Sequence, residues 1–197
     1  LGEREDISLE DVDLVFIRKD PPFDEQYQWL TLLLERLRGK TLVINDPRGL
    51  REANEKLYAC HFPELMPDTL VCADKTRIAQ FVTDVGGRAV IKPVDGFGGH
   101  GVLSLIAGDP NFHGAIEMLT VGGTQVVMVQ RYLPEISTGD KRILLLDGEP
   151  LGVFARIPQG GDLRSNLRVG GKAEPRTLTA GDKKIIDTVA PRLKQDG

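Results

Sequence analysis

Val90-Ile-Lys-Pro-Val-Asp-Gly-Phe-Gly-Gly-His-Gly101 is a short apolar run followed by a glycine-rich loop, and the next apolar run, 102–106, begins at once. The pattern predicts strand, loop and strand, with Lys92 at the end of the first strand. Glycines let the backbone turn tightly and bring its N–H groups close to a ligand. Successive N–H groups aimed at one point bind an anion, and the lysine beside them suits a phosphate. The same residues also suit a plain β-hairpin.

The composition of the 197 residues is that of a globular protein, with 41% hydrophobic and 27% charged residues. A formal net charge of −4 gives no reason to expect nucleic acid as a partner. Segment 140–176 is nevertheless net positive, which favours a small anionic ligand.

Cellular location and metal content are judged from the cysteines and the apolar runs. Cys60 and Cys72 are the only cysteines, so neither a disulfide scaffold nor a zinc cluster is expected, and the cytoplasm is the expected location. The sequence carries no signal peptide and no apolar run near 18 residues, so no membrane partner is expected. The chain begins without Met and stops just past an expected helix, and we expect an internal piece of a longer protein.

Alternating strand and helix patterns extend through the chain. Asp24 is expected to cap a helix reaching about Arg38, with one apolar stripe made of Trp29, Leu30, Leu33, Leu34 and Leu37. A short helix is expected to contain Asn54-Glu55-Lys56, and the Asp147-Gly148 pair predicts a hairpin turn. Further strands are expected at 12–17, 41–44, 69–72, 126–130, 141–146 and 151–157, and further helices at 74–85, 111–119 and 179–193.

Two segments without periodicity carry charged residues. Arg18-Lys-Asp-Pro-Pro-Phe-Asp24 follows a strand and is either a ligand-binding loop or a solvated turn. Segment 158–175, with paired glycines at both ends, is either disordered surface or an active-site lid. His100 is expected to be a neutral surface imidazole, and Lys56 alone is an ordinary surface lysine.

The order of motifs resembles the ATP-grasp fold, an α/β (α+β) architecture. The motifs are Asn54-Glu-Lys, Lys92-Pro with the glycine loop, Gln130-Arg-Tyr-Leu, Gly139-Asp-Lys-Arg and Ala155-Arg-Ile-Pro. More narrowly, Arg18-Lys-Asp-Pro-Pro-Phe-Asp and Pro158-Gln-Gly-Gly-Asp-Leu-Arg-Ser-Asn-Leu-Arg are similar to bacterial glutathione synthetase. The resemblance implies the end of an N-terminal α/β region at 1–52 and an ATP-grasp domain at 53–197. Within that domain it implies a lid subdomain at about 70–135 and a loop, 158–175, over the active site.

The resemblance also implies the roles of individual residues. The residues implied to bind ATP are Lys56, Lys92, Gly96, Gly98, Gly99, Gln130, Arg131, Tyr132, Leu133, Asp140 and Lys141. Arg18, Arg142, Arg156 and Asn166 would bind substrate, since guanidinium groups clamp carboxylates. Arg142, Arg156 and Arg164 would be catalytic. This chain contains no match to the family's magnesium ligands, an Asp and a Glu-x-Asn pair, and we expect them on strands after Gly197.

The implied reaction joins γ-glutamylcysteine and glycine through an acyl phosphate, using ATP and Mg²⁺. The expected partners are these small molecules, and relatives suggest a homo-oligomer. Two other functions stay open: another ATP-grasp carboxylate–amine ligase, or a non-catalytic nucleotide-binding module.

Overall fold

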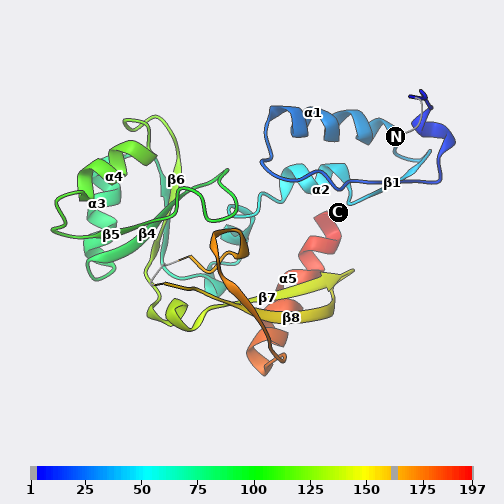
Figure 1. The fold of residues 1–197 in the computed structure, drawn as a ribbon. Coiled ribbons are helices and arrows are strands. Elements are labelled where there is room, and N and C mark those ends of the chain that lie inside the picture. The colour runs from blue at the N-terminus through cyan, green and yellow to red at the C-terminus, as the bar shows by residue number, and fades with distance from the viewer. Residues whose placement is uncertain (1–3, 161–163, 197) are drawn as a thin grey trace.

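The computed structural model describes residues 4–160 and 164–196, in three groups of elements (Figure 1). The first group holds a two-stranded parallel sheet, β1 (Leu14–Phe16) and β2 (Leu42–Ile44), with helices α1 (Glu25–Leu34) and α2 (Pro47–Glu52). The strands expected at 12–17 and 41–44 are therefore confirmed. Short 3₁₀ turns occupy Leu9–Asp11, Glu35–Leu37, Tyr58–His61, Pro63–Leu65, Pro134–Thr138 and Leu167–Val169.

Helix α1 starts as expected but buries a different face. The Asp24 carboxylate accepts the N–H of Tyr27 at 2.8 Å and caps the helix. The buried side chains are Tyr27, Thr31 and Leu34, whereas Trp29 is 55% and Leu33 is 64% exposed. The predicted stripe was therefore wrong for Trp29 and Leu33, because apolar residues lie on both sides of this helix and sequence spacing does not select the side that packs.

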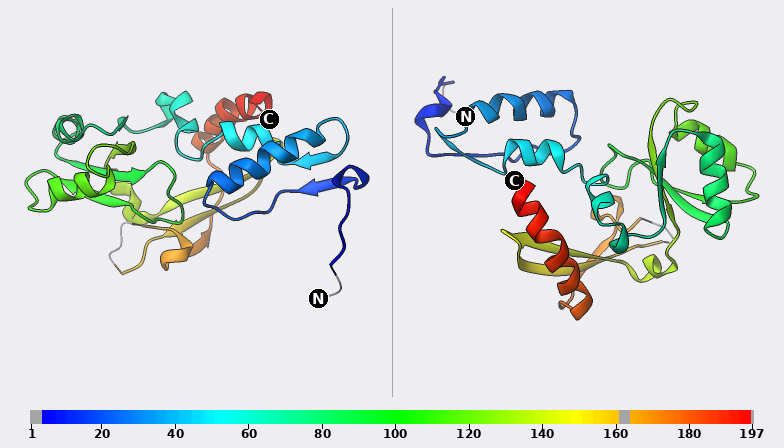
Figure 2. Two further views of the ribbon diagram at one scale, coloured as in Figure 1. Left: turned by 90° about the horizontal axis from the view of Figure 1, so that it is seen from above. Right: turned by 180° about the vertical axis from the view of Figure 1, so that it is seen from behind.

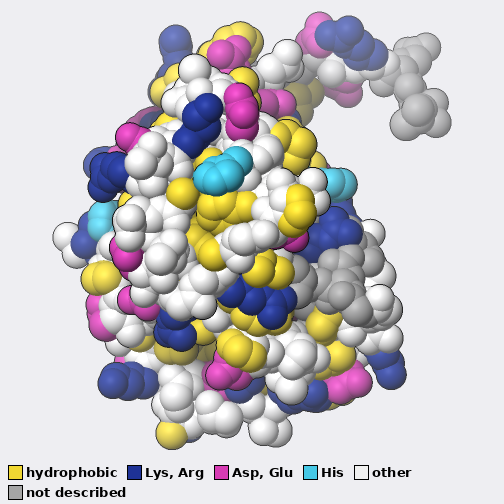
Figure 3. All heavy atoms as spheres, turned by 90° about the vertical axis from the view of Figure 1, so that its left-hand side faces the viewer, with side chains coloured by type: hydrophobic (Ala, Val, Ile, Leu, Met, Phe, Trp, Pro, Cys, Tyr) yellow, Lys and Arg dark blue, Asp and Glu magenta, His cyan; other side chains and the backbone are white. Residues whose placement is uncertain are grey.

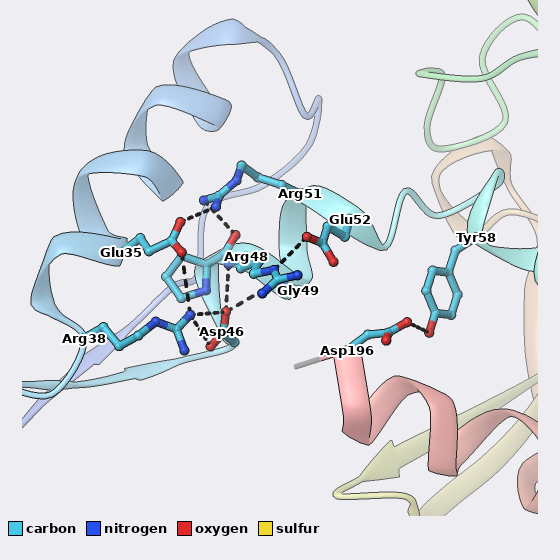
Figure 4. A network of polar contacts seen from close by, with 10 residues as sticks. Glu35, Arg38, Asp46, Arg48, Gly49, Arg51, Glu52, Tyr58 and Asp196 are labelled. Carbon is cyan, nitrogen blue, oxygen red and sulfur yellow. Dashed lines mark hydrogen bonds and ion pairs between the residues drawn. The ribbon is translucent and has the colours of Figure 1, made fainter.

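Helix α2 ends at Glu52, so the expected helix through Asn54-Glu55-Lys56 was wrong. The Asn54 side-chain oxygen accepts the N–H groups of Lys56 and Leu57, both at 2.9 Å, and this local turn competes with the helix. Before it, Asp46 caps α2 by accepting the N–H of Arg48 at 2.8 Å. Figure 4 shows this cap within a polar network that joins α1 to α2.

The second group is a four-stranded antiparallel sheet in the order β3-β6-β4-β5. Its strands are β3 (Thr69–Cys72), β4 (Arg88–Pro93), β5 (Leu103–Ile106) and β6 (Val127–Arg131). Helices α3 (Lys75–Asp84) and α4 (Phe112–Leu119) cover one face, as the views in Figure 2 also show. These strands and helices confirm the elements expected between 69 and 131.

Alternation along these strands divides the sheet into an apolar face and a polar face. Ala89 and Ile91 of β4 and Val129 of β6 are fully buried in the core that also holds Ile78 of α3 and Ile116 of α4. Their neighbours point the other way, because successive side chains of a strand alternate. Val90, Lys92 and Gln130 therefore share the face that the helices leave uncovered.

The third group is an antiparallel sheet of β7 (Asp140–Leu146), β8 (Glu149–Ile157) and β9 (Lys172–Pro175), beside helix α5 (Ala180–Asp196). The hairpin is confirmed, and Asp147 and Gly148 both have positive φ angles, as a type I′ turn requires. Segment 158–175 is not wholly irregular, since its last residues form β9 against β8. Backbone pairing rather than apolar spacing creates this edge strand. Residues 161–163 of the segment lie outside the described residues.

No helix among the described residues is long and apolar enough to cross a membrane. Figure 3 shows the face of the four-stranded group, where Lys and Arg side chains are interspersed with Asp and Glu.

Candidate functional site

A cavity of about 270 Å³ opens on the uncovered face of the four-stranded sheet. Strands β4 and β6 form one wall, the segment after β6 forms another, and residues 164–166 lie across it. The lining residues are Pro67, Val90, Lys92, Val102, Gln130, Arg131, Tyr132, Leu133, Ile136, Asp140, Arg164, Ser165 and Asn166.

Lys92 is the half-buried cation of this cavity. Its Nζ donates to Oε1 of Gln130 at 2.6 Å, and Nε2 of Gln130 donates to Oγ1 of Thr69 at 2.9 Å. Burial, and next the charge of Lys56, lower the pKa of Lys92. The ammonium groups of Lys56 and Lys92 repel each other. An anion bound near both would relieve this repulsion.

Lys56 reaches the glycine-rich loop from a different part of the chain. Its Nζ donates to the carbonyl oxygen of Gly96 and forms an ion pair of 3.0 Å with Glu55. The turn made by Asn54 fixes the backbone of Lys56. The structure therefore brings Lys56 to the glycine-rich loop, although the sequence around Lys56 reads as that of a surface lysine.

The last residue of β6, Arg131, and the two residues after it, Tyr132 and Leu133, line the cavity. The N–H groups of Arg131 and Tyr132 already donate to the carbonyls of Asp68 and Arg88, at 2.9 and 3.2 Å. In the part of the chain that the structure describes, the N–H of Leu133 has no hydrogen-bond partner. Leu133 is therefore the residue of this segment whose N–H is available to donate a hydrogen bond to a ligand.

The side chains of that same segment have structural partners. The Arg131 guanidinium pairs with Asp68 at 3.0 Å, and the Arg88 guanidinium stacks 3.6 Å from the centre of the Tyr132 ring. These contacts hold the segment between the residue before β3 and the first residue of β4, the two strands that flank β6.

Asp140 and Arg156 form a paired group at the start of the third sheet. Nε of Arg156 donates to Oδ1 of Asp140 at 2.7 Å, and a second bond joins Nη2 to Oδ2. The two residues are also register partners across β7 and β8. The carboxylate lines the cavity, so Arg156 is held beside the cavity through Asp140.

Three other expected cations do not converge on the cavity. Lys141 pairs with Asp182 of α5 at 2.5 Å, on the opposite face of β7 from Asp140. Arg142 is exposed, and the Arg18 guanidinium lies 5.5 Å from the centre of the Phe16 ring. Lys19, not Arg18, lines a neighbouring cavity of about 250 Å³ beside the glycine loop.

The long loop lies directly on the glycine-rich loop. A Cβ on Gly99 would be 2.8 Å from Oδ1 of Asn166 and 3.3 Å from Cδ of Arg164, so these side chains would have to shift, and the φ angle of +87° also favours glycine here. Gly98 is similarly close to Cδ of Arg168, at 3.4 Å from an added Cβ. The two loops therefore pack against each other, and residues 164–166 of the long loop line the cavity.

Sequence reasoning missed Thr69, Val90, Val102 and Ser165. Alternation from Lys92 could have placed Val90 on the cavity face, since the two residues are two apart on one strand. Thr69 had no such signal, because its position opposite Gln130 depends on the pairing of β3 with β6. Ser165 is 3% exposed within a polar loop, and only the fold buries it.

The described residues contain no group of three or more His, Cys, Asp and Glu side chains that could hold a metal ion.

Comparison with solved structures defines the fold class. D-cycloserine synthetase DcsG has a TM-score of 0.69 at 17% identity, covering 95% of this chain and 67% of that one. The RimK domain protein ATP-grasp from Sphaerobacter thermophilus scores 0.65 at 19% identity, covering 93% and 65%. The ATP-grasp ligase PsnB, complexed with minimal precursor, Mg and ADP, scores 0.57 at 19% identity, covering 87% and 50%. The protein has the ATP-grasp fold, as the motifs predicted.

Sequence comparison gives the family. The model of the prokaryotic glutathione synthetase ATP-grasp domain matches residues 55–197, and the model of the N-terminal domain of prokaryotic glutathione synthetase matches residues 1–51. The chain belongs to the prokaryotic glutathione synthetase family.

Curated relatives agree with the family models. The chain is 49% identical over 195 residues to glutathione synthetase of Gloeobacter violaceus, covering 96% of this chain and 60% of that protein. It is 45% identical over 199 residues to glutathione synthetase of Escherichia coli strain K12, covering 100% and 62%. The chain thus spans about 60% of the length of these relatives.

Proposed function

We propose that this chain is the nucleotide-binding part of an ATP-dependent ligase that joins γ-glutamylcysteine to glycine. The observation that carries the proposal is the convergence of Lys92, Gln130, Leu133 and the loop at 164–166 on one cavity, in a member of the glutathione synthetase family. The boundary expected at 52/53 is part of the proposal, and the two family models, which meet between residues 51 and 55, support it.

ATP fits the groups around the cavity. Lys92 and Lys56 would hold the phosphates, with the loop Gly96–Gly99 above them. The N–H of Leu133 and the walls of Val90 and Val102 would receive the base. The adenine-nucleotide complex of the structurally similar ligase PsnB supports this choice of ligand.

The first chemical step would form the acyl phosphate. The carboxylate oxygen of the dipeptide attacks the γ-phosphorus, the bond from that phosphorus to the β–γ bridging oxygen breaks, and ADP leaves. Negative charge gathers at the transferring phosphoryl group, where Lys92 and the Arg156 guanidinium, fixed by Asp140, would stabilise it.

The second step would form the amide. The glycine amine attacks the acyl carbon, the carbon–oxygen bond to phosphate breaks, and the departing phosphate accepts the proton that the amine loses. Arg164 and Asn166, which lie over the cavity against Gly99, would contact the intermediate, and their loop would exclude water from it. Mg²⁺ would neutralise phosphate charge.

The remaining expectations stay part of the proposal. Arg18, Arg142 and Asn166 are retained as candidate substrate contacts, although the structure leaves Arg18 and Arg142 outside the cavity. A homo-oligomer is supported by the exposed Trp29 and Leu33 of α1, and light scattering tests it. A cytoplasmic location stays a prediction.

The test of the activity uses the full-length protein, because this fragment alone is expected to be inactive, and measures phosphate release with ATP, Mg²⁺, γ-glutamylcysteine and glycine, omitting each in turn. Release that requires all four supports the proposal. Release that is independent of the dipeptide and glycine refutes it, and release that requires a different amine identifies another carboxylate–amine ligase. ATP binding without release under any combination favours the nucleotide-binding module.

A further inference from the structure

A row of hydrogen-bonded polar side chains crosses three neighbouring strands and ends at Lys92. Thr69 of β3 faces Gln130 of β6 in register, and Gln130 faces Val90 of β4, two residues before Lys92. The three polar side chains therefore share one face of the sheet. Oγ1 of Thr69 donates to the carbonyl of Pro67 at 2.7 Å, and the bonds from Gln130 to Thr69 and from Lys92 to Gln130 follow at 2.9 and 2.6 Å.

The hydrogens available on Thr69, Gln130 and Lys92 allow these hydrogen bonds to run in one direction only. The hydroxyl of Thr69 has one hydrogen, and the Pro67 carbonyl takes it, because a carbonyl can only accept. The Thr69 oxygen must then accept from Gln130, so the amide NH₂ points toward Thr69. The amide oxygen of Gln130 consequently points toward the Lys92 ammonium, which can only donate.

This orientation matters because Lys92 has no carboxylate partner among the described residues. The charged groups that line its cavity are Arg131, Asp140 and Arg164, and Lys56 is the charge that acts on it most strongly. Burial and Lys56 both lower the pKa of Lys92, and the Gln130 oxygen opposes them. A reversed amide would instead turn N–H groups toward the ammonium.

We propose that Thr69 is a positioning residue for phosphate binding, which fixes the amide of Gln130 so that its oxygen holds the Lys92 ammonium in the cavity. The role in phosphate binding rests on the proposed nucleotide function, whereas the hydrogen bonds that orient Gln130 do not. Thr69 does not line the cavity, so any effect on a ligand is transmitted through Gln130 and Lys92.

The structure offers a matched control for the loss of the hydroxyl. Thr120 also donates to a backbone carbonyl at 2.7 Å, that of Ile116, and accepts one N–H, that of Gly123 at 3.1 Å. It lies at the end of α4, away from the cavity lining. Thr120→Val therefore removes an equivalent pair of hydrogen bonds and leaves the bonds among Thr69, Gln130 and Lys92 intact. Thr69→Ser is the second control, because it keeps the hydroxyl.

The first measurement needs no nucleotide. NMR titration of the ¹³Cε signal of Lys92, assigned with Lys92→Met, reports the pKa of Lys92 directly. Thr69→Val is expected to lower this pKa further, because the Gln130 oxygen is no longer held against the ammonium. Thr69→Ser and Thr120→Val are expected to leave it at the wild-type value. An unchanged Lys92 pKa in Thr69→Val overturns the inference, whether or not the protein binds ATP.

The second measurement compares ATP with adenosine by calorimetry. Thr69→Val is expected to weaken ATP binding about fivefold, the effect of one neutral hydrogen bond, and to leave adenosine binding within about twofold. In a Lys92→Met background the effect of Thr69→Val on ATP should disappear. Equal losses for ATP and adenosine, or a loss that persists without Lys92, overturn the inference. Failure of the wild-type chain to bind ATP would instead refute the proposed nucleotide site.

Discussion

Replacing Lys92 by Met should separate nucleotide affinity from stability. The substitution keeps most of the apolar stem but removes the ammonium that donates to Gln130. Charge-assisted contacts contribute roughly 1.5–3 kcal/mol each, so ATP affinity should fall about 10- to 150-fold. The matched control is Lys172→Met on β9, whose side chain is 68% exposed and lies 4.0 Å from Glu174. Its affinity for ATP should stay within about twofold of wild type.

Stability should respond differently from affinity. Burial and the Lys56 charge lower the pKa of Lys92 in the folded protein, so the unfolded chain binds this proton more tightly. At neutral pH the charged side chain therefore opposes folding, and this cost falls as the pH rises through the lowered pKa toward about 10.4. Lys92→Met removes the cost together with the bond to Gln130, so the free energy of unfolding should change by less than about 1 kcal/mol.

Calorimetric titration with ATP and urea denaturation at pH 7 measure the two quantities. An equal loss of ATP affinity in Lys92→Met and Lys172→Met would refute the placement of Lys92 at the phosphates. A loss of several kcal/mol of stability in Lys92→Met would show that the side chain serves mainly to hold the sheet together.

Two further substitutions test the third sheet and its loop. The hydrogen bond from Lys141, and next the one from the N–H of Thr179, lower the pKa of Asp182 to about 2. The stabilisation that the Asp182 carboxylate contributes is therefore present above pH 4 and is lost as the pH falls toward 2. Asp182→Asn should therefore be less stable than the wild type in urea denaturation at pH 6 and nearly as stable at pH 2, and a difference that does not depend on pH would contradict this account. A Cβ on Gly171 would collide with the carbonyl oxygen of Ser165, so Gly171→Ala should cost about 1–3 kcal/mol in urea denaturation and weaken ATP binding. Gly152→Ala, where a Cβ meets nothing within 4 Å, should stay within about 0.5 kcal/mol, and equal costs at the two glycines would show that the loop accommodates the methyl group.

The local patterns of the sequence were sufficient for most elements. The glycines after Pro93, the Asp147-Gly148 turn and the Asp24 cap each act over a few residues, so their structures follow from neighbouring residues alone. The expected helix stripe was wrong at Trp29 because packing selected the other side of α1. The expected helix at Lys56 was wrong because the Asn54 side chain accepts the N–H of Lys56. Strand β9 was missed because it depends on pairing with β8.

The sequence by itself determined that Lys92 stands near the end of a strand before a glycine-rich loop, because both features lie within twelve consecutive residues. Only the tertiary structure decided which residues act on Lys92. The strand order β3-β6-β4 places Thr69 beside Gln130, 61 residues away in the chain, and a turn outside any helix brings Lys56 to Gly96. Pairing between strands distant in sequence is set by the burial of whole faces, which no local pattern encodes.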